Sequence, residues 1–230
     1  MPATAAPPWT LAGLVATSRE DAARLDLAAP AAGLVVGGAA ADHLLGLDLR
    51  GPAGPPADHW MRGADLTAIY EPEDRRRLRA TAMWRPYPAA EAAWELVVSA
   101  QTSLLHADAT LAVVSDLTGD AASWTTAADR GRWTPLGEPR RLPAEAAAVL
   151  VRRRDTAALV AVHPQDPRGI AVATARGRAR IECTIFPAAI EKGVILRSRA
   201  LAAVGPAADA EAWAAALCAT FAASPPFLDT

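Results

Sequence analysis

Apolar and polar positions alternate along residues 58–85, and this pattern predicts β-structure. In the second half of the segment, one side of an extended chain carries Leu78, Ala80, Ala82 and Trp84, and the other carries Arg77, Arg79, Thr81 and Arg85. Met83 is the exception on the polar side. A period of two is typical of a strand with one packed face and one wetter face. We therefore interpret the segment as two strands joined by a charged turn around Pro72 and Asp74.

Apolar runs elsewhere predict a chain made mainly of strands. They cover residues 9–17, two parts of 33–49 separated by Gly37 and Gly38, 93–101, 109–117, 147–152, 157–163, 169–175, 178–186 and 192–204. Residues 118–146 are polar and contain prolines, so we expect an irregular loop there, held to the body by Trp124 and Trp133.

One helix is expected at the C-terminal end, over about residues 207–223. Trp213, Leu217 and Phe221 recur every four residues and form one apolar stripe. Pro206 suits the first turn, and the Ser-Pro-Pro sequence at 224–226 ends the helix. The prediction is a mostly β protein, a large two-sheet antiparallel β-sandwich forming a single domain over residues 1–230, with a C-terminal α-helix.

Composition excludes several classes of partner. The net charge of −2 and the pI of about 6.1 argue against a nucleic-acid-binding protein. No apolar run reaches the ~18 residues that a membrane span needs. The N-terminal sequence has no basic residue before Arg19 and no sustained apolar core, so it is a poor signal peptide. We expect a cytoplasmic protein in which Cys183 and Cys218 are buried free thiols rather than a disulfide.

The common cofactor and metal motifs are missing from the sequence. It has no G-x-G-x-x-G or P-loop run, no H-E-x-x-H, no C-x-x-C and no G-x-S-x-G. The histidines, His43, His59, His106 and His163, are far apart along the chain. We therefore expect no cofactor and no metal site.

A first candidate site combines polar and aromatic residues around the predicted hairpin. Its members are His59, Trp60, Arg62, Asp65, Tyr70 and Glu71, followed by Trp84 and Arg85. Aromatic faces pack against the C–H surfaces of sugars, and carboxylates, arginine and histidine hydrogen-bond the hydroxyls. The alternative is that the tryptophans Trp60, Trp84 and Trp94 are core residues of a sandwich.

A second candidate site follows Glu191 and Lys192. Arg197 and Arg199 lie on the same side of a predicted strand as Glu191. Such a set holds an anionic ligand, or it forms a charge ladder between neighbouring strands.

Two segments also carry a family resemblance. WMRGADLTAIYE with the later WR pair, and EKGVILRSR near residue 195, resemble blocks of uncharacterised bacterial proteins of the planctomycete type. The matching residues are Trp60, Arg62, Gly63, Asp65, Leu66, Tyr70, Glu71, Trp84, Arg85, Glu191, Lys192, Gly193, Val194, Ile195, Arg197 and Arg199. That family is similar to galactose-mutarotase-like β-supersandwich proteins, so the resemblance implies a supersandwich fold. The epimerase histidine pair and glutamate base have no matching positions here.

Three functions follow from these observations. The first is a carbohydrate-related binding protein that holds a carbohydrate or a small anionic ligand on a polar sheet face. The second is a sugar-active enzyme with epimerase-like or glycosidase-like chemistry, in which Glu71 or Glu191 is the acid or base and His59 assists. The third is a structural or assembly protein whose aromatic residues are all core. The sequence carries no signal for a particular oligomeric state.

Overall fold

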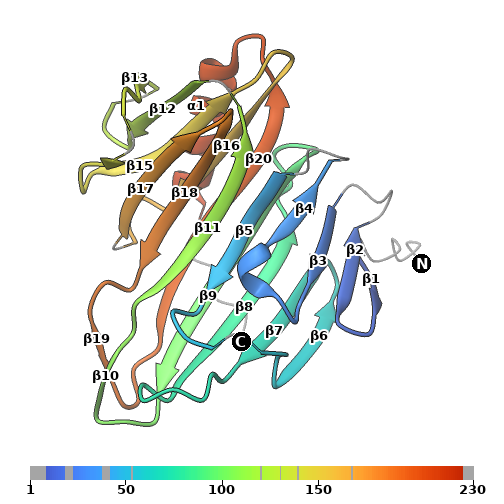
Figure 1. Ribbon diagram of the computed structural model, residues 1–230, viewed down its shortest axis with the longest axis vertical. Coiled ribbons are helices and arrows are strands. Elements are labelled where there is room, and N and C mark those ends of the chain that lie inside the picture. The colour runs from blue at the N-terminus through green and yellow to red at the C-terminus, as the bar shows by residue number, and fades with distance from the viewer. Residues whose placement is uncertain are drawn as a thin grey trace.

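The computed structural model of the 230-residue chain describes residues 9–18, 23–37, 42–52, 54–119, 121–129, 131–138, 140–166 and 168–224. It confirms a mostly β, antiparallel two-sheet sandwich with one C-terminal helix. Figure 1 shows the two large sheets stacked on each other, with the helix α1 against one of them.

The first sheet has nine strands. In spatial order they are β1 (Trp9–Ala12), β2 (Val15–Ser18), β3 (Ala23–Asp26), β4 (Leu34–Val36), β5 (Asp42–Asp48), β11 (Leu111–Thr118), β18 (Arg178–Ile185), β17 (Arg168–Ala175) and β14 (Arg140–Arg141). A short 3₁₀ turn at Pro30–Ala32 precedes β4.

The second sheet also has nine strands. In spatial order they are β13 (Thr134–Pro135), β12 (Ala121–Thr126), β15 (Ala146–Arg152), β16 (Thr156–Val162), β20 (Leu196–Pro206), β9 (Ala93–Thr102), β8 (Leu78–Pro86), β7 (Asp65–Tyr70) and β6 (Asp58–Arg62). A separate two-stranded ribbon pairs β10 (His106–Asp108) with β19 (Ala189–Glu191) at one end of the sandwich (Figure 1).

Side-chain alternation builds the main core between the sheets. Along β8 the buried residues are Leu78, Ala80, Ala82 and Trp84, as the pattern predicts, and the intervening positions are more exposed. Their buried partners on the first sheet include Leu45, Leu47 and Val113. Leucine, valine and alanine side chains from both inner faces fill this core, so hydrophobic burial holds the two sheets together.

Helix α1 (Ala210–Ala223) builds a second core on the outer face of the second sheet, the face turned away from the first sheet. Its buried residues Ala214, Leu217 and Phe221 pack with Leu159 of β16 and Leu201 of β20. The predicted apolar stripe therefore faces the sheet, except that Trp213 is only partly buried. The helix covers the half of the outer face formed by β15, β16 and β20.

Three sequence expectations need correction. Residues 9–18 form two strands rather than one, because Gly13, with a φ of 60°, allows a turn between β1 and β2. The segment expected to be one strand before Pro72 is the hairpin β6–β7. Residues 118–146 are not an irregular loop, since they contain β12, β13 and β14.

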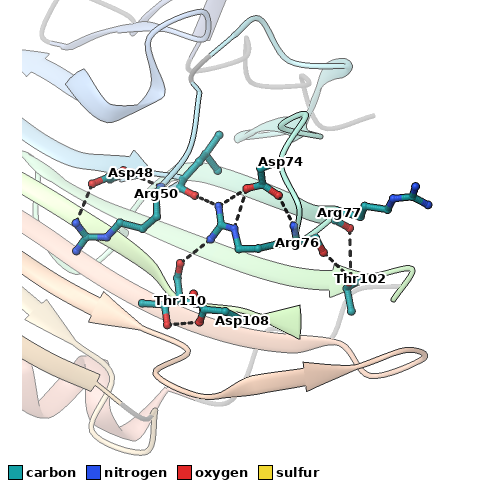
Figure 2. A network of polar contacts seen from close by, with 9 residues as sticks. Asp48, Arg50, Asp74, Arg76, Arg77, Thr102, Asp108 and Thr110 are labelled. Atoms are coloured by element: carbon teal, nitrogen blue, oxygen red, sulfur yellow. Dashed lines mark hydrogen bonds and ion pairs between the residues drawn. The ribbon is translucent and has the colours of Figure 1, made fainter. Parts of the chain in front are cut away.

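Arg76 ties the two sheets together at one end of the sandwich (Figure 2). It lies in the turn between β7 and β8 and pairs with Asp74, 2.6 Å away. The same guanidinium donates to the backbone carbonyl of Thr110, at 3.1 Å, and to that of Leu49, both on the side of the first sheet. The Thr102 hydroxyl on β9 stabilises the same turn by donating to the Arg76 carbonyl at 2.9 Å.

Both cysteines are free thiols, as expected. Cys183 is fully buried in the main core, and burial raises the pKa of its thiol to about 12. Cys218 lies on α1, and burial raises the pKa of this thiol to about 12 as well. A raised pKa keeps both groups in the unreactive thiol form near neutral pH.

Candidate functional site

A polar groove lies on the outer face of the second sheet, beside the half that α1 covers. It encloses about 390 Å³ and crosses strands β6, β7, β8, β9 and β20. Its lining consists of Trp60, Arg62, Gly63, Asp65, Thr67, Thr81, Met83, Val97, Ser99 and Arg197. The groove therefore lies beside the strands that α1 contacts, which are β15, β16 and β20.

Trp60 stands at the rim of the groove on the edge strand β6. Its side chain is 40% exposed, which is unusual for tryptophan in a chain whose Trp9, Trp84 and Trp94 are buried. It lies opposite Thr67 in the strand register. An exposed indole beside hydroxyl groups offers an apolar platform next to hydrogen-bonding partners.

A row of alternating charges crosses the face next to the groove. Arg62 lies opposite Asp65, and Arg85 lies opposite Glu95. Asp65 and Arg85 are themselves neighbours, one step beyond the register pair Leu66 and Trp84. Opposite charges on adjacent strands stabilise such a row.

Glu95 forms the buried end of this row. Its carboxylate is fully buried and accepts two hydrogen bonds from Arg85, at 2.8 and 2.5 Å. Its other oxygen lies 3.8 Å from Arg199. Arg199 also donates to the hydroxyl and the carbonyl of Ser224, at 3.1 Å each, so it fastens the end of α1 to the sheet.

The structure thus brings five of the predicted site residues to one face. They are Arg62, Asp65, Arg85, Arg197 and Arg199, from four different strands. Arg62, Asp65 and Arg197 line the groove, whereas Arg85 and Arg199 lie beside it and hold Glu95.

Five other predicted residues lie elsewhere. Tyr70 is buried in the main core, where its hydroxyl donates to the Leu27 carbonyl at 3.0 Å and burial raises its pKa. His59 lies opposite Ala68, which is buried on the inner face, so its side chain points away from the groove. Glu71 lines a separate hollow near the β7–β8 turn and pairs with Arg79 at 3.3 Å.

Glu191 and Lys192 also lie away from the groove. Glu191 is on the ribbon strand β19, is exposed, and lies 3.8 Å from His106. Lys192 follows it and is exposed. The expected side-by-side arrangement of Glu191 with Arg197 and Arg199 does not occur, because residues 192–195 separate β19 from β20 and β19 pairs with β10 instead.

Three groove residues were not singled out from the sequence for a ligand role. Thr67, Thr81 and Ser99 place hydroxyl groups along the floor, and the Arg197 Nε donates to the Ser99 hydroxyl at 3.3 Å. A single threonine or serine in a strand carries no specific signal for a ligand. Only the fact that all three side chains point outward from neighbouring strands could have indicated a shared role.

An apolar cavity of about 250 Å³ lies between α1 and the second sheet. Alanines, Phe221 and Cys218 line most of it. Across the described part of the chain, no group of three or more histidine, cysteine or acidic residues could hold a metal ion. Over that same part, no helix has the length and apolar character needed to cross a bilayer.

Comparison with known proteins identifies the fold. No protein-family model and no curated protein sequence matches the chain. Among solved structures, it is similar to a candidate aldose 1-epimerase from Escherichia coli K12, with a TM-score of 0.50 and 10% identity over 64% of this chain and 67% of that one. A candidate aldose 1-epimerase from Klebsiella pneumoniae gives a TM-score of 0.42 and 10% identity over 72% and 58% of the two chains.

The Escherichia coli structure therefore defines the class of fold as an aldose-epimerase-like β-sandwich. This agrees with the galactose-mutarotase-like fold implied by the sequence resemblance. Membership of the planctomycete-type family stays a prediction. At 10% identity, the similarity shows the fold alone, and function has to be argued from the residues of the site.

Proposed function

We propose that this protein binds carbohydrate in the polar groove of the second sheet. The observation that carries the proposal is the exposed Trp60 at the rim of a groove whose floor presents hydroxyl and guanidinium groups. A sugar ring has an apolar C–H face and a polar rim, and this lining offers a partner for each.

The groove also has suitable hydrogen-bonding partners for sugar hydroxyls. Thr67, Thr81 and Ser99 both donate and accept, Asp65 accepts, and the guanidiniums of Arg62 and Arg197 donate. Except for Arg62 on the edge strand β6, these groups lie on strands that are paired on both sides, so they are positioned before a ligand arrives. The description of the Escherichia coli structure as a candidate aldose 1-epimerase is in line with a sugar ligand.

Binding is favoured over catalysis because the groove holds few acid–base groups. Asp65 is the only carboxylate among its described lining residues, and no histidine lines it. Glycoside chemistry ordinarily needs two carboxylates across the bond. Glu71, Glu191 and His59, the residues considered for catalysis, lie on three different parts of the molecule.

Calorimetric titration with a panel of mono- and oligosaccharides tests the proposal. We expect one sugar class to bind the wild-type protein and to raise its melting temperature, since a ligand of the folded state stabilises it. Trp60→Ala should weaken that binding roughly 10-fold or more, as expected when an aromatic platform of about 1–3 kcal/mol is lost.

Met61→Ala is the matched control. Met61 neighbours Trp60 on the same strand, is 37% exposed, and lies opposite Leu66 on the other side of the sheet. Its removal should leave the affinity unchanged. A protein that binds no saccharide of the panel, or a Trp60→Ala variant that binds as tightly as wild type, would contradict the proposal.

A further inference from the structure

Strand β6 is the free edge of the second sheet, and nearly all of it is exposed (Figure 1). In the part of the chain that the structure describes, β6 is hydrogen-bonded to β7 alone. Four of its five residues are exposed, and His59 is half-buried. An exposed edge presents unpaired backbone amides and carbonyls, so it can pair with a further strand.

Two large apolar side chains stand on this short strand, one on each side of the sheet. Trp60 is 40% exposed on the outer side. Met61 lies opposite Leu66, which is buried in the main core, so Met61 is on the inner side, yet it is 37% exposed. The main core is therefore incompletely covered at this edge. Adjacent apolar side chains on a free strand edge gain free energy when another surface covers them.

The backbone groups at the free edge belong to His59 and Met61. Arg62 and Asp65 flank a two-residue turn, and residues in such positions exchange both backbone hydrogen bonds. Bonded and non-bonded pairs alternate along an antiparallel ladder, so His59 and Met61 direct their amides and carbonyls away from β7. The His59 amide accordingly donates to the side chain of Asp58, 2.8 Å away, rather than to β7.

The charges of β6 are complementary to those of a second β6 strand. Asp58 and Arg62 lie two positions before and two positions after Trp60, on the same side of the strand. When two copies pair antiparallel about a two-fold axis at Trp60, Asp58 of each copy lies opposite Arg62 of the other. The two indoles then face each other between two ion pairs, and His59 of each copy exchanges backbone hydrogen bonds with Met61 of the other. Opposite charges and aromatic pairs directly across a ladder are both stabilising.

Neighbouring registers lack this match. A shift of the pairing by one residue would place outward side chains against inward ones, which the alternation of a strand forbids. A two-fold axis at His59 puts Asp58 opposite Trp60, and an axis at Met61 puts Arg62 opposite Trp60, so neither register forms an ion pair. The charges of β6 therefore select the register that is centred on Trp60.

We propose that β6 is a self-association site, at which two copies of this protein pair antiparallel about Trp60 and form a two-fold dimer. The second sheet then continues from one copy into the other, and the two polar grooves meet at the pair of Trp60 side chains. Because the pairing strands have five residues each, we expect a reversible dimer rather than an obligate one. The inference does not depend on carbohydrate binding.

Sedimentation equilibrium tests the dimer at protein concentrations from about 1 μM to about 1 mM, the range of weak protein affinities. The average mass of the wild-type protein should rise with concentration from 23.9 kDa toward twice that value. Asp58→Arg and Arg62→Asp each place like charges across the two-fold axis. Each single variant should therefore dimerise roughly 10-fold more weakly, or weaker still.

A mixture of the two single variants gives the sharpest result. In a mixed pair, the Asp58→Arg copy presents two guanidiniums to the two carboxylates of the Arg62→Asp copy, so opposite charges meet again at both positions. We expect the equimolar mixture to dimerise about as strongly as wild type, although each variant alone does so weakly. The double variant Asp58→Arg/Arg62→Asp should also dimerise like wild type, because exchanging the two charges preserves their match.

Arg154→Asp is the control for charge reversal. Arg154 is exposed in the turn between β15 and β16, in the half of the sheet away from β6, and its reversal should leave dimerisation unchanged. Melting temperatures should show that every variant is folded.

Three outcomes would overturn the proposal. The first is a wild-type protein that stays monomeric over the whole range, and the second is association that both single variants retain. The third is a mixture that associates no more strongly than its two components. A failed dimer leaves the carbohydrate proposal standing, because saccharide titration of the monomer tests that proposal separately.

Discussion

At the scale of single residues, exposure separates side chains of the same type. Trp84 has no exposed surface and Trp60 is 40% exposed, although the two indoles belong to strands of the same sheet. The sequence predicts Trp84 as a packed residue because three apolar neighbours share its side of β8. No such neighbours accompany Trp60, so its environment could be learned only from the structure.

Replacing Trp84 with alanine should lower the free energy of unfolding by about 3–5 kcal/mol, the usual cost of a large core deletion. Its indole also donates to the Leu45 carbonyl at 3.0 Å, and Leu45 has a φ of 53°, which is strained for leucine. Urea denaturation of wild type and variant measures the change. Trp60→Ala is the control, with an expected loss below about 1 kcal/mol. A Trp84→Ala loss as small as that of the control would contradict the core role.

At the scale of elements, the hairpin β6–β7 explains which candidate residues could be predicted. If residues 58–71 formed one strand, Trp60, Arg62 and Tyr70 would share a face. The two-residue turn at Gly63 and Ala64 instead sets Arg62 opposite Asp65. The odd-numbered residues of β7 therefore lie on the same face of the sheet as the even-numbered residues of β6. Tyr70 consequently points into the core. The turn at Gly63, which has a φ of 60°, therefore places Arg62 and Asp65 on the groove face and Tyr70 in the core.

The docking of α1 carries a pH dependence through His163, which follows β16. This imidazole is buried and meets the Phe221 ring edge-on, with the ring centroids 5.3 Å apart. Burial, and next the charge of Arg199, lower its pKa, while Asp166, the Ala222 backbone and Glu95 oppose the shift. The pKa in the folded protein is therefore below the value of about 6.5 expected in the unfolded chain.

Because the unfolded chain takes up the proton at the higher pH, stability should fall as the pH drops below about 6.5. His163→Gln removes this proton uptake. The stability difference between wild type and variant should therefore shift against wild type on acidification, and urea denaturation at a series of pH values measures it. A difference that stays constant across the series would show that His163 does not titrate differently in the two states.

At the scale of the whole molecule, the sandwich class followed from the sequence but the order of the strands did not. Alternation marks β8 clearly, because this strand has one buried face over several residues. Strands β9 and β16 are buried on both faces over most of their length, and apolar runs mark them instead. The two-residue strands β13 and β14 are too short for a pattern. Partners such as β5 and β11, about 65 residues apart in sequence, are selected by packing between the sheets, and a local pattern cannot report that choice.

Arg76 joins the two sheets, so its loss should be felt by the entire sandwich. Arg76→Met keeps much of the side-chain volume but removes the hydrogen bonds to Leu49, Thr110 and Asp74 (Figure 2). We expect a loss of about 2–3 kcal/mol, since these are hydrogen bonds of a charged and mostly buried group. Thermal and urea unfolding measure it.

Arg75→Met is the control for this change, because Arg75 is an exposed neighbour in the same turn. Its expected effect lies within about 0.5 kcal/mol of wild type. Equal stability of the two variants would mean that the Arg76 contacts contribute little to holding the sheets together.

The rim of the groove is an edge strand, and this has a consequence for recognition. In the described structure β6 is hydrogen-bonded to β7 alone, so it can open locally at a lower free-energy cost than the central strands. Opening would carry Trp60 and Arg62 away while Arg197, on the central strand β20, stays in place. A ligand that contacts both Trp60 and Arg197 of a single copy therefore gives up some of its binding energy to hold β6 in place. We expect its contact with Arg197 to last longer than its contact with Trp60.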